Sequence, residues 1–144
     1  MESRPEEQLG AKLGETARVW RGLLDKRLRP LGLSQTRWMA ILHLSKTRDG
    51  LAQTELAARM GISHASLSPQ IDRLVEDGWV ERRSREEDRR CKTIHLTEQA
   101  RTLSHEIKQT AAKLRSELFE GLGDEDIRSC ERVLAHILRR AHSL

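Results

Sequence analysis

The chain has 144 residues, of which 33% are charged, 3% are aromatic and two are cysteines. It contains no run of the roughly 18 apolar residues that a membrane-spanning helix needs, and no signal-peptide pattern. Two cysteines are too few for a disulfide framework, and they lack metal-binding spacing with nearby histidines. These totals predict a cytosolic, mainly helical protein of one ordinary domain or two small lobes, with no membrane, metal or cofactor partner.

The net charge is +4 and the pI is near 9.5. Such a balance suits a nucleic acid or another anionic partner, although many basic proteins bind neither. The distribution of charge is more informative than its sum, because residues 82–92 carry six Arg or Lys and three acids, whereas the rest of the chain is nearly balanced. Any nucleic-acid-binding site is therefore expected to include this segment.

Apolar residues recur every three or four positions through most of the chain, a spacing typical of amphipathic helices. Ser34 and Ser63 are suitable helix caps, and Gly61 and Gly78 are suitable helix stops. Two short segments instead predict a β-hairpin, with strands near residues 79–83 and 92–96. The predicted helices, in chain order, cover approximately residues 9–28, 34–48, 53–60, 63–77, 97–118 and 124–141.

The third and fourth predicted helices have the features of a helix-turn-helix. Ala57 is small enough to let two helices cross closely, Gly61 permits a sharp bend four residues later, and Ile62 can fill the gap beneath them. In a helix-turn-helix the second helix enters the DNA major groove. A helical hairpin in an ordinary bundle is the alternative, but the hairpin that follows favours the winged form.

The charged tip of the hairpin has its own physical interpretation. Two short strands bury little area, so stability alone does not explain them. Arginine side chains can enter a minor groove, where the negative potential is deepest. The acids at 86–88 fit this interpretation as tethers that orient neighbouring arginines, and the alternative is a solvated loop of mixed charge.

The segment "DRRCKTIHLT" has Asp88, one residue, Arg90, five residues and then Leu96-Thr97. This spacing resembles the Asp-x-Arg-x5-Leu-Thr signature of the MarR family of winged-helix transcription regulators, and residues 51–83 resemble its helix-turn-helix and first wing strand. The resemblance covers nearly the whole chain. It implies a single domain over 1–144, mainly α with a small β-hairpin wing and six helices. Its expected parts are a DNA-binding lobe at 33–97 and a helical dimerisation region at 6–30 and 98–144.

The family resemblance also implies an obligate homodimer whose two lobes contact a palindromic double-stranded DNA. Apolar stripes along 9–28 and 107–141 exceed what one small lobe could cover, which fits this expectation. An internal helical bundle is the alternative.

By the same resemblance, the fourth predicted helix is the recognition helix. Hydroxyl, imidazole and amide groups can bond phosphates or base edges. Local capping and solvation are the alternative for its histidine and serines. The expected DNA contacts on this helix are Ser63, His64, Ser66, Ser68, Gln70 and Arg73.

On the wing, Arg90 matches the family's arginine that enters the minor groove or pairs with an acid on the recognition helix. Asp72 is at the position of that acid, so we predict an Asp72–Arg90 contact in the DNA-free protein. Arg89 and Lys92 are expected phosphate contacts, and Asp88 is expected to orient the neighbouring arginines.

Two residues leave alternatives open. Pro69 lies where many family members carry a base-reading basic residue, and proline removes a helical N–H, so the operator sequence is not predicted. Cys91 lies among basic residues that would favour its thiolate, which suggests a redox-responsive regulator. Its other interpretation is simply a small residue at the start of a strand.

The resemblance further implies an effector, such as an aromatic or phenolic acid, bound between the winged lobe and the dimer helices. Trp20 and Trp38 are also suited to the hydrophobic core. The residues expected to line the pocket are Trp20, Arg21, Trp38 and His43.

The sequence thus predicts a homodimeric, sequence-specific double-stranded DNA-binding regulator, acting as a repressor that a small molecule relieves. The alternatives are a winged-helix protein-interaction module without DNA binding and a thiol redox-responsive regulator acting through Cys91. An enzyme is not expected, because no nucleophile–base pair or metal cluster is apparent.

Overall fold

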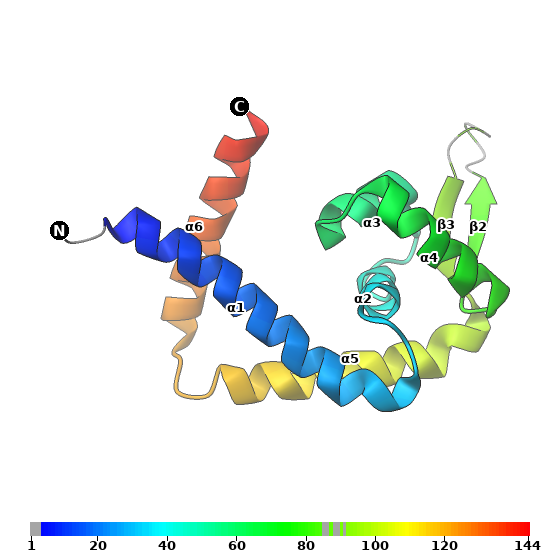
Figure 1. Ribbon diagram of the computed structural model, residues 1–144, viewed down its shortest axis with the longest axis horizontal. Helices are drawn as coiled ribbons and strands as arrows, with labels where there is room; N and C mark the ends of the chain where they lie inside the picture. Colours follow the sequence, from blue (N-terminus) through cyan, green and yellow to red (C-terminus); the bar gives the residue numbers. More distant parts are fainter. Residues whose placement is uncertain (1–3, 85–86, 88–89, 91) are drawn as a thin grey trace. The chain divides into compact units, whose positions relative to one another are not determined.

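Six α-helices and one three-stranded sheet make up the part of the chain that the computed structural model describes, residues 4–84, 87, 90 and 92–144 (Figure 1). This mainly helical winged fold confirms the predicted class. The helices are α1 (Pro5–Leu28), α2 (Gln35–Leu44), α3 (Gln53–Met60), α4 (His64–Glu76), α5 (Arg101–Leu118) and α6 (Asp124–His142), with 3₁₀ turns η1 (Arg29–Leu31) and η2 (Glu98–Ala100). The strands are β1 (Leu51–Ala52), β2 (Val80–Ser84) and β3 (Lys92–Leu96).

The chain divides into two compact units, residues 1–112 and 113–144. In the first unit, α2, α3, α4 and the sheet bury a shared apolar core. Its side chains include Trp38, Ile41, Leu56, Leu67 and Ile94, each at most 1% exposed. Removing such side chains from water stabilises the fold by about 1.5–3 kcal/mol each.

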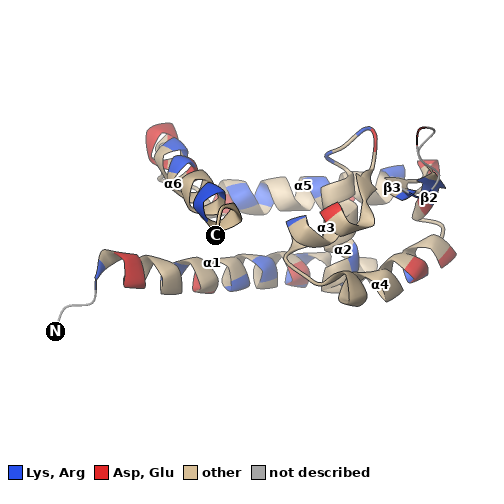
Figure 2. Cartoon of the chain, turned by 90° about the horizontal axis from the view of Figure 1, so that it is seen from above, with Lys and Arg blue, Asp and Glu red and all other residues tan. Residues whose placement is uncertain are grey.

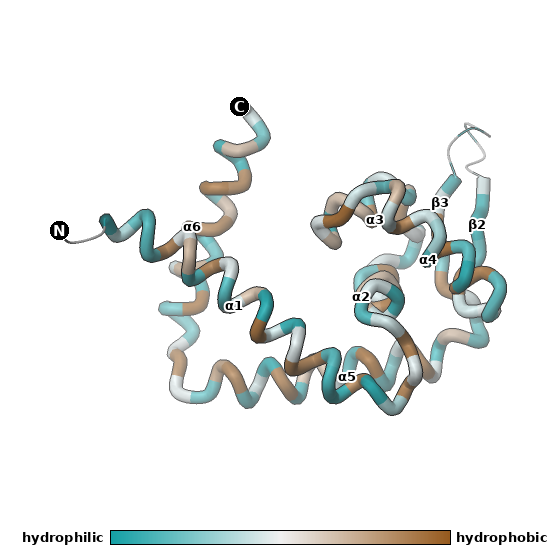
Figure 3. The backbone as a smooth tube through the Cα atoms, viewed as in Figure 1, coloured by the Kyte–Doolittle hydropathy of each residue, from teal (hydrophilic) through white to brown (hydrophobic). Residues whose placement is uncertain are grey.

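The second unit contains the end of α5 and the whole of α6. None of the residues of α6 is buried. Its apolar side chains Val133, Ile137 and Leu138 are exposed, and Figure 3 shows apolar and polar positions alternating along the helix. An exposed apolar face of this kind is typical of a helix that packs against another segment or another chain.

The turn between α3 and α4 has the predicted features. Gly61 ends α3 with φ of 70°, a left-handed conformation that glycine adopts without strain. Ala57 is buried, as the close crossing of the two helices requires. The Ile62 N–H donates to the Ala57 carbonyl at 3.1 Å, which closes the turn.

The sheet has the order β1-β3-β2, with both pairs antiparallel. The hairpin of β2 and β3 was predicted, whereas β1 was not, because two residues are too short to show an alternating pattern. In the hairpin, Glu81 pairs with His95 and Arg83 with Thr93, so these four side chains lie on one face of the sheet.

One local detail differs from the sequence prediction. The fifth helix was predicted to begin at residue 97, whereas Thr97 caps the single turn η2 and α5 begins at Arg101. In the described residues, no helix is both long enough and apolar enough to cross a bilayer.

Candidate nucleic-acid interface

The helix α4 is anchored along one side and open along the other. Leu67, Ile71 and Leu74 are fully buried, at the three- and four-residue spacing of a helical stripe. Ser63 caps the helix, because its Oγ accepts a hydrogen bond from the Ser66 N–H at 3.0 Å. The helix therefore presents its polar residues outward from a rigid base.

The structure places the predicted recognition residues on the outer part of α4. Ser63, His64, Ser66 and Arg73 are exposed, while Ser68 and Gln70 are half-buried. The capping interpretation of Ser63 is confirmed, and its hydroxyl also donates to the Ser66 Oγ at 2.8 Å. Base or phosphate contacts by these residues stay a prediction.

His64 links the two helices of the motif. Its Nε2 lies 3.2 Å from the Nε2 of Gln53, the first residue of α3. This contact holds the imidazole at the start of α4, where the helix N-terminus carries a partial positive charge. An anionic group such as a DNA phosphate is favoured at that position.

The wing is joined to α4 by an ion pair between β2 and the recognition helix. Arg82 of β2 donates from its Nη2 to the Asp72 Oδ1 at 2.6 Å. Asp72 thus has Arg82 as a partner, which the sequence analysis did not predict, and the predicted Asp72–Arg90 contact stays a prediction. Strand register explains the pairing with Arg82, because Arg82 lies opposite Ile94, on the face of the sheet that packs toward α4.

Positive charge is concentrated on the hairpin and not on α4 itself. The helix carries one arginine, Arg73, against the two acids Asp72 and Glu76. Figure 2 shows basic residues along β2 and β3. Lys92 and Arg90 are exposed beside the tip, and three other predicted wing residues, Asp88, Arg89 and Cys91, lie outside the described residues.

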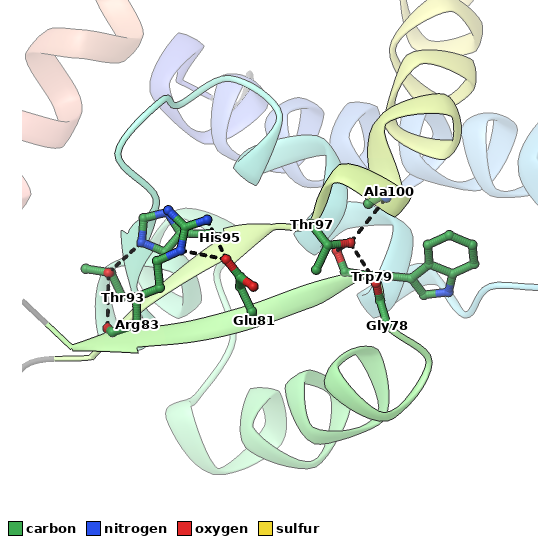
Figure 4. Close-up of polar contacts among 8 residues, drawn as sticks. All are labelled: Gly78, Trp79, Glu81, Arg83, Thr93, His95, Thr97 and Ala100. Carbon is green, nitrogen blue, oxygen red and sulfur yellow. Dashed lines mark hydrogen bonds and ion pairs between the residues drawn. The ribbon is translucent and has the colours of Figure 1, made fainter.

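The face of the hairpin that points away from α4 holds a polar network (Figure 4). Arg83 forms an ion pair with Glu81 on the same strand. Thr93 Oγ1 lies 2.7 Å from the Nε2 of His95 and donates to the Arg83 carbonyl at 3.3 Å. Burial lowers the pKa of His95 below its ordinary value of 6.5, and the charge of Arg83 lowers it further, while Glu81 and Asp49 raise it.

Thr97 ties the base of the wing to the helix that follows (Figure 4). Its Oγ1 donates to the Gly78 carbonyl at 2.6 Å and accepts from the Ala100 N–H at 3.2 Å. Its own N–H donates to the Trp79 carbonyl at 3.1 Å. One residue therefore joins the turn after α4, the end of β3 and the start of η2, which gives a structural reason for the Leu-Thr pair in the sequence signature.

The four residues expected around an effector have different environments. Trp38 is 1% exposed and its Nε1 donates to the Asp25 Oδ1 at 2.8 Å, so it anchors α2 to α1. Trp20 and His43 are half-buried, and Arg21 is exposed. Burial lowers the pKa of His43, with smaller contributions from Lys46 and Arg59. An effector at these residues stays a prediction.

Two cavities of about 270 Å³ lie in the first unit, and neither is lined by these four residues. One lies among α2, the loop after it, the hairpin and α5, and the other among α1, η1 and α5. No group of three or more His, Cys, Asp or Glu side chains suited to a metal ion occurs among the described residues.

A capped helix after a tight glycine turn, followed by a basic hairpin, defines a winged helix-turn-helix protein. Comparison with known proteins agrees with this class. The family model for the MarR family matches residues 31–90. The crystal structure of the transcriptional regulator PA3341 shares 39% identity with a TM-score of 0.89, over 94% of this chain and 99% of that one.

Two further crystal structures extend the similarity. A MarR-family transcriptional regulator from Rhodococcus sp. RHA1 shares 26% identity with a TM-score of 0.78, over 94% of this chain and 96% of its own. CouR from Rhodococcus jostii RHA1, bound to p-coumaroyl-CoA, shares 26% identity with a TM-score of 0.82, over 94% and 95% of the two chains. The chain belongs to the MarR family of winged helix-turn-helix transcriptional regulators.

Proposed function

We propose that this chain is a homodimeric transcriptional repressor that binds a palindromic double-stranded DNA through α4 and the wing. In this proposal residues 33–97 form the DNA-binding lobe, and residues 6–30 and 98–144 form the dimerisation region. A small aromatic acid-like effector releases the DNA.

The observation that carries the proposal is the ion pair between Arg82 and Asp72. It fixes the basic hairpin to the polar helix, so both elements can approach a duplex as one body. Residues of α4, among them Ser66, Gln70 and Arg73, would contact base edges or phosphates in the major groove. Arg90 and Lys92 would neutralise phosphates or enter the minor groove beside it.

Homodimer formation is supported by apolar side chains that stay exposed in each unit. In the first unit, α1 exposes Leu9, Leu13 and Val19, and in the second, α6 exposes Ile137 and Leu138. Self-complementary burial of such faces is the usual origin of a two-fold dimer. Two lobes related by that symmetry would require an operator with matching half-sites.

The proposed effector class rests on the CouR comparison together with the side chains near α1 and α2. CouR holds p-coumaroyl-CoA, the thioester of a phenolic acid. In this chain, Arg21 supplies an exposed guanidinium for a carboxylate, and Trp20 and His43 supply flat, half-buried side chains.

A matched pair of lysine variants tests the DNA-binding role. Lys92→Ala should weaken binding to a DNA fragment selected from a random pool, because a phosphate contact is lost. Each lost contact also reduces the steepness of the plot of log K against log salt by about 0.9. Two copies in a dimer would reduce the slope by about 2. Fluorescence anisotropy across a salt series measures both the affinity and the slope.

Lys12→Ala is the control, because Lys12 is an exposed lysine on α1 whose loss changes the net charge equally. It should leave the slope unchanged. If Lys12→Ala and Lys92→Ala reduce the DNA affinity and the salt slope equally, net charge alone governs binding, and the proposed interface would be wrong.

A further inference from the structure

A cavity of about 270 Å³ lies behind the wing, on the opposite side from α4. Its walls come from the end of α2, the loop to β1, the hairpin and α5. The hairpin contributes Arg83 and His95, which lie on the other face of the sheet from Arg82, the residue that contacts α4. The cavity is therefore distinct from the surface proposed to contact bases.

The lining of this cavity is strongly positive. Among its described lining residues, none is Asp or Glu. Serine and threonine hydroxyls from Ser45, Thr47 and Ser104 add hydrogen-bonding groups. Its basic and imidazole side chains are Arg48, Arg83, Arg101, Lys108, His95 and His105.

Convergence of so many cations in a concave site carries an electrostatic cost. Like charges raise each other's free energy, and solvent screens part of this repulsion because Arg83 and Arg101 are exposed, at 56% and 78% of their side chains. Nearby acids offset part of this charge, since Glu81 pairs with Arg83 and Glu98 pairs with Arg101 at 3.1 Å. Arg48 and Lys108 add further positive charge from the loop and from α5.

The imidazole of His95 also lines the cavity, and Arg83 is the one cation of the cavity among the causes that shift its pKa. Burial lowers its pKa, the charge of Arg83 lowers it further, and Glu81 and Asp49 partly oppose this. The guanidinium of Arg101 and the ammonium of Lys108 line the same cavity from α5. An anion placed among these groups would favour the protonated imidazole, since an opposite charge within a few ångströms stabilises the cation.

We propose that this cavity is a binding site for a small free anion with two or more phosphate or carboxylate groups, held by Arg48, Arg83, Arg101 and Lys108. Its volume fits a compact ion and lies just below the range of about 300–1,000 Å³ typical of larger organic ligands. The site is separate from the effector position near Trp20 and His43. Because Arg83 and His95 belong to the wing, an anion bound there contacts the same hairpin that carries the proposed DNA contacts.

Inorganic pyrophosphate and citrate are suitable probes, titrated into the full chain at constant ionic strength by isothermal calorimetry. We expect saturable binding that Arg48→Ala and Lys108→Ala each weaken by about tenfold or more, because a lost charged hydrogen bond is typically worth that much. Arg48→Lys should recover part of the affinity. The His95 imidazole, followed by NMR, should show a pKa that rises on addition of pyrophosphate.

Lys46→Ala is the matched control, because Lys46 is an exposed lysine of the same loop that does not line the cavity. It should bind pyrophosphate like the parent chain. Absence of saturable binding by the parent would overturn the proposal. Equal losses in Lys46→Ala and Arg48→Ala, or an unchanged His95 pKa, would also overturn it.

DNA-binding measurements on the Arg48→Ala variant distinguish a free anion from a phosphate of the DNA backbone, since both offer the same chemistry to the cavity. If the site takes a free anion, Arg48→Ala leaves the salt slope of DNA binding unchanged. A slope reduced by about 1 per protomer would assign the cavity to a DNA phosphate and overturn the proposal. The calorimetric arm does not depend on DNA binding, so failure of the proposed function and failure of this site give different results.

Discussion

Gly50, at the start of the segment that leads into β1, has no room for a side chain. Its φ is 71°, and a Cβ would lie 2.5 Å from the carbonyl oxygen of Ile94 and 2.7 Å from the His95 ring. Gly50→Ala should therefore destabilise the fold by about 3 kcal/mol or more, from left-handed strain and overpacking together. Chemical denaturation measures the free energy of unfolding.

Gly61→Ala is the matched control for that prediction. Its φ of 70° is almost the same, yet a Cβ there would meet no atom within 4 Å. Gly61→Ala should lower the free energy of unfolding by the cost of left-handed strain alone, about 1–2 kcal/mol. Equal losses at the two positions would show that β3 moves aside at no cost, which would contradict the close packing of Gly50.

His43 makes stability depend on pH. Its pKa is lowered from 6.5, first by burial and then by Lys46 and Arg59, so the folded state resists protonation. The unfolded chain then binds more protons near that pH, and stability falls as the pH drops through about 6.5. His95 contributes with the same sign.

Urea denaturation between about pH 7.5 and 5.5 checks this prediction. The parent chain should lose more free energy of unfolding over the range than His43→Gln does. If the two proteins lose the same amount, or the parent gains stability at low pH, burial does not control the protonation of His43.

At the scale of elements, the junction of β3 and η2 depends on one hydroxyl. Thr97→Val removes both the bond to the Gly78 carbonyl and the cap of the Ala100 N–H. It should cost about 1–3 kcal/mol, as typical for a lost cap combined with an unsatisfied group. Thr97→Ser keeps the hydroxyl and should cost less than Val at the same position, in thermal or urea unfolding. The reverse order would assign the role of Thr97 to its methyl group.

The elements that were predictable from sequence are those specified by local residues. Ser34 and Ser63 cap their helices as expected, because capping depends on side chains within three residues. The strand β1 was missed because Leu51 and Ala52 are too few to show a period, and they become a strand only by pairing with β3.

The candidate site was predictable only in part, for a similar reason. The polar residues of α4 follow from helical periodicity. The ion pair of Asp72 with Arg82 was not predicted, because strand register decides which side chains of β2 turn toward α4. The basic cavity gathers residues such as Arg48, Arg83 and Lys108 that are far apart in sequence, so no local pattern indicates it.

At the scale of the whole molecule, exposed apolar surface and wing charge have complementary proposed roles. The apolar faces of α1 and α6 are suited to pairing two copies, and the hairpins are suited to phosphates. Because α4 carries little positive charge, most of the affinity is expected from the wing and most of the specificity from the hydroxyls and amide of α4.

The central claim is that two copies present paired α4–wing units to one duplex. Its most direct test is the stoichiometry and affinity of binding to a selected palindromic site, compared with the same duplex in which one half-site is scrambled. We predict two protomers per duplex and a loss of at least about 100-fold on scrambling, since each mismatched base pair costs about 1–3 kcal/mol. A single protomer bound, or equal affinity for the two duplexes, would contradict the account.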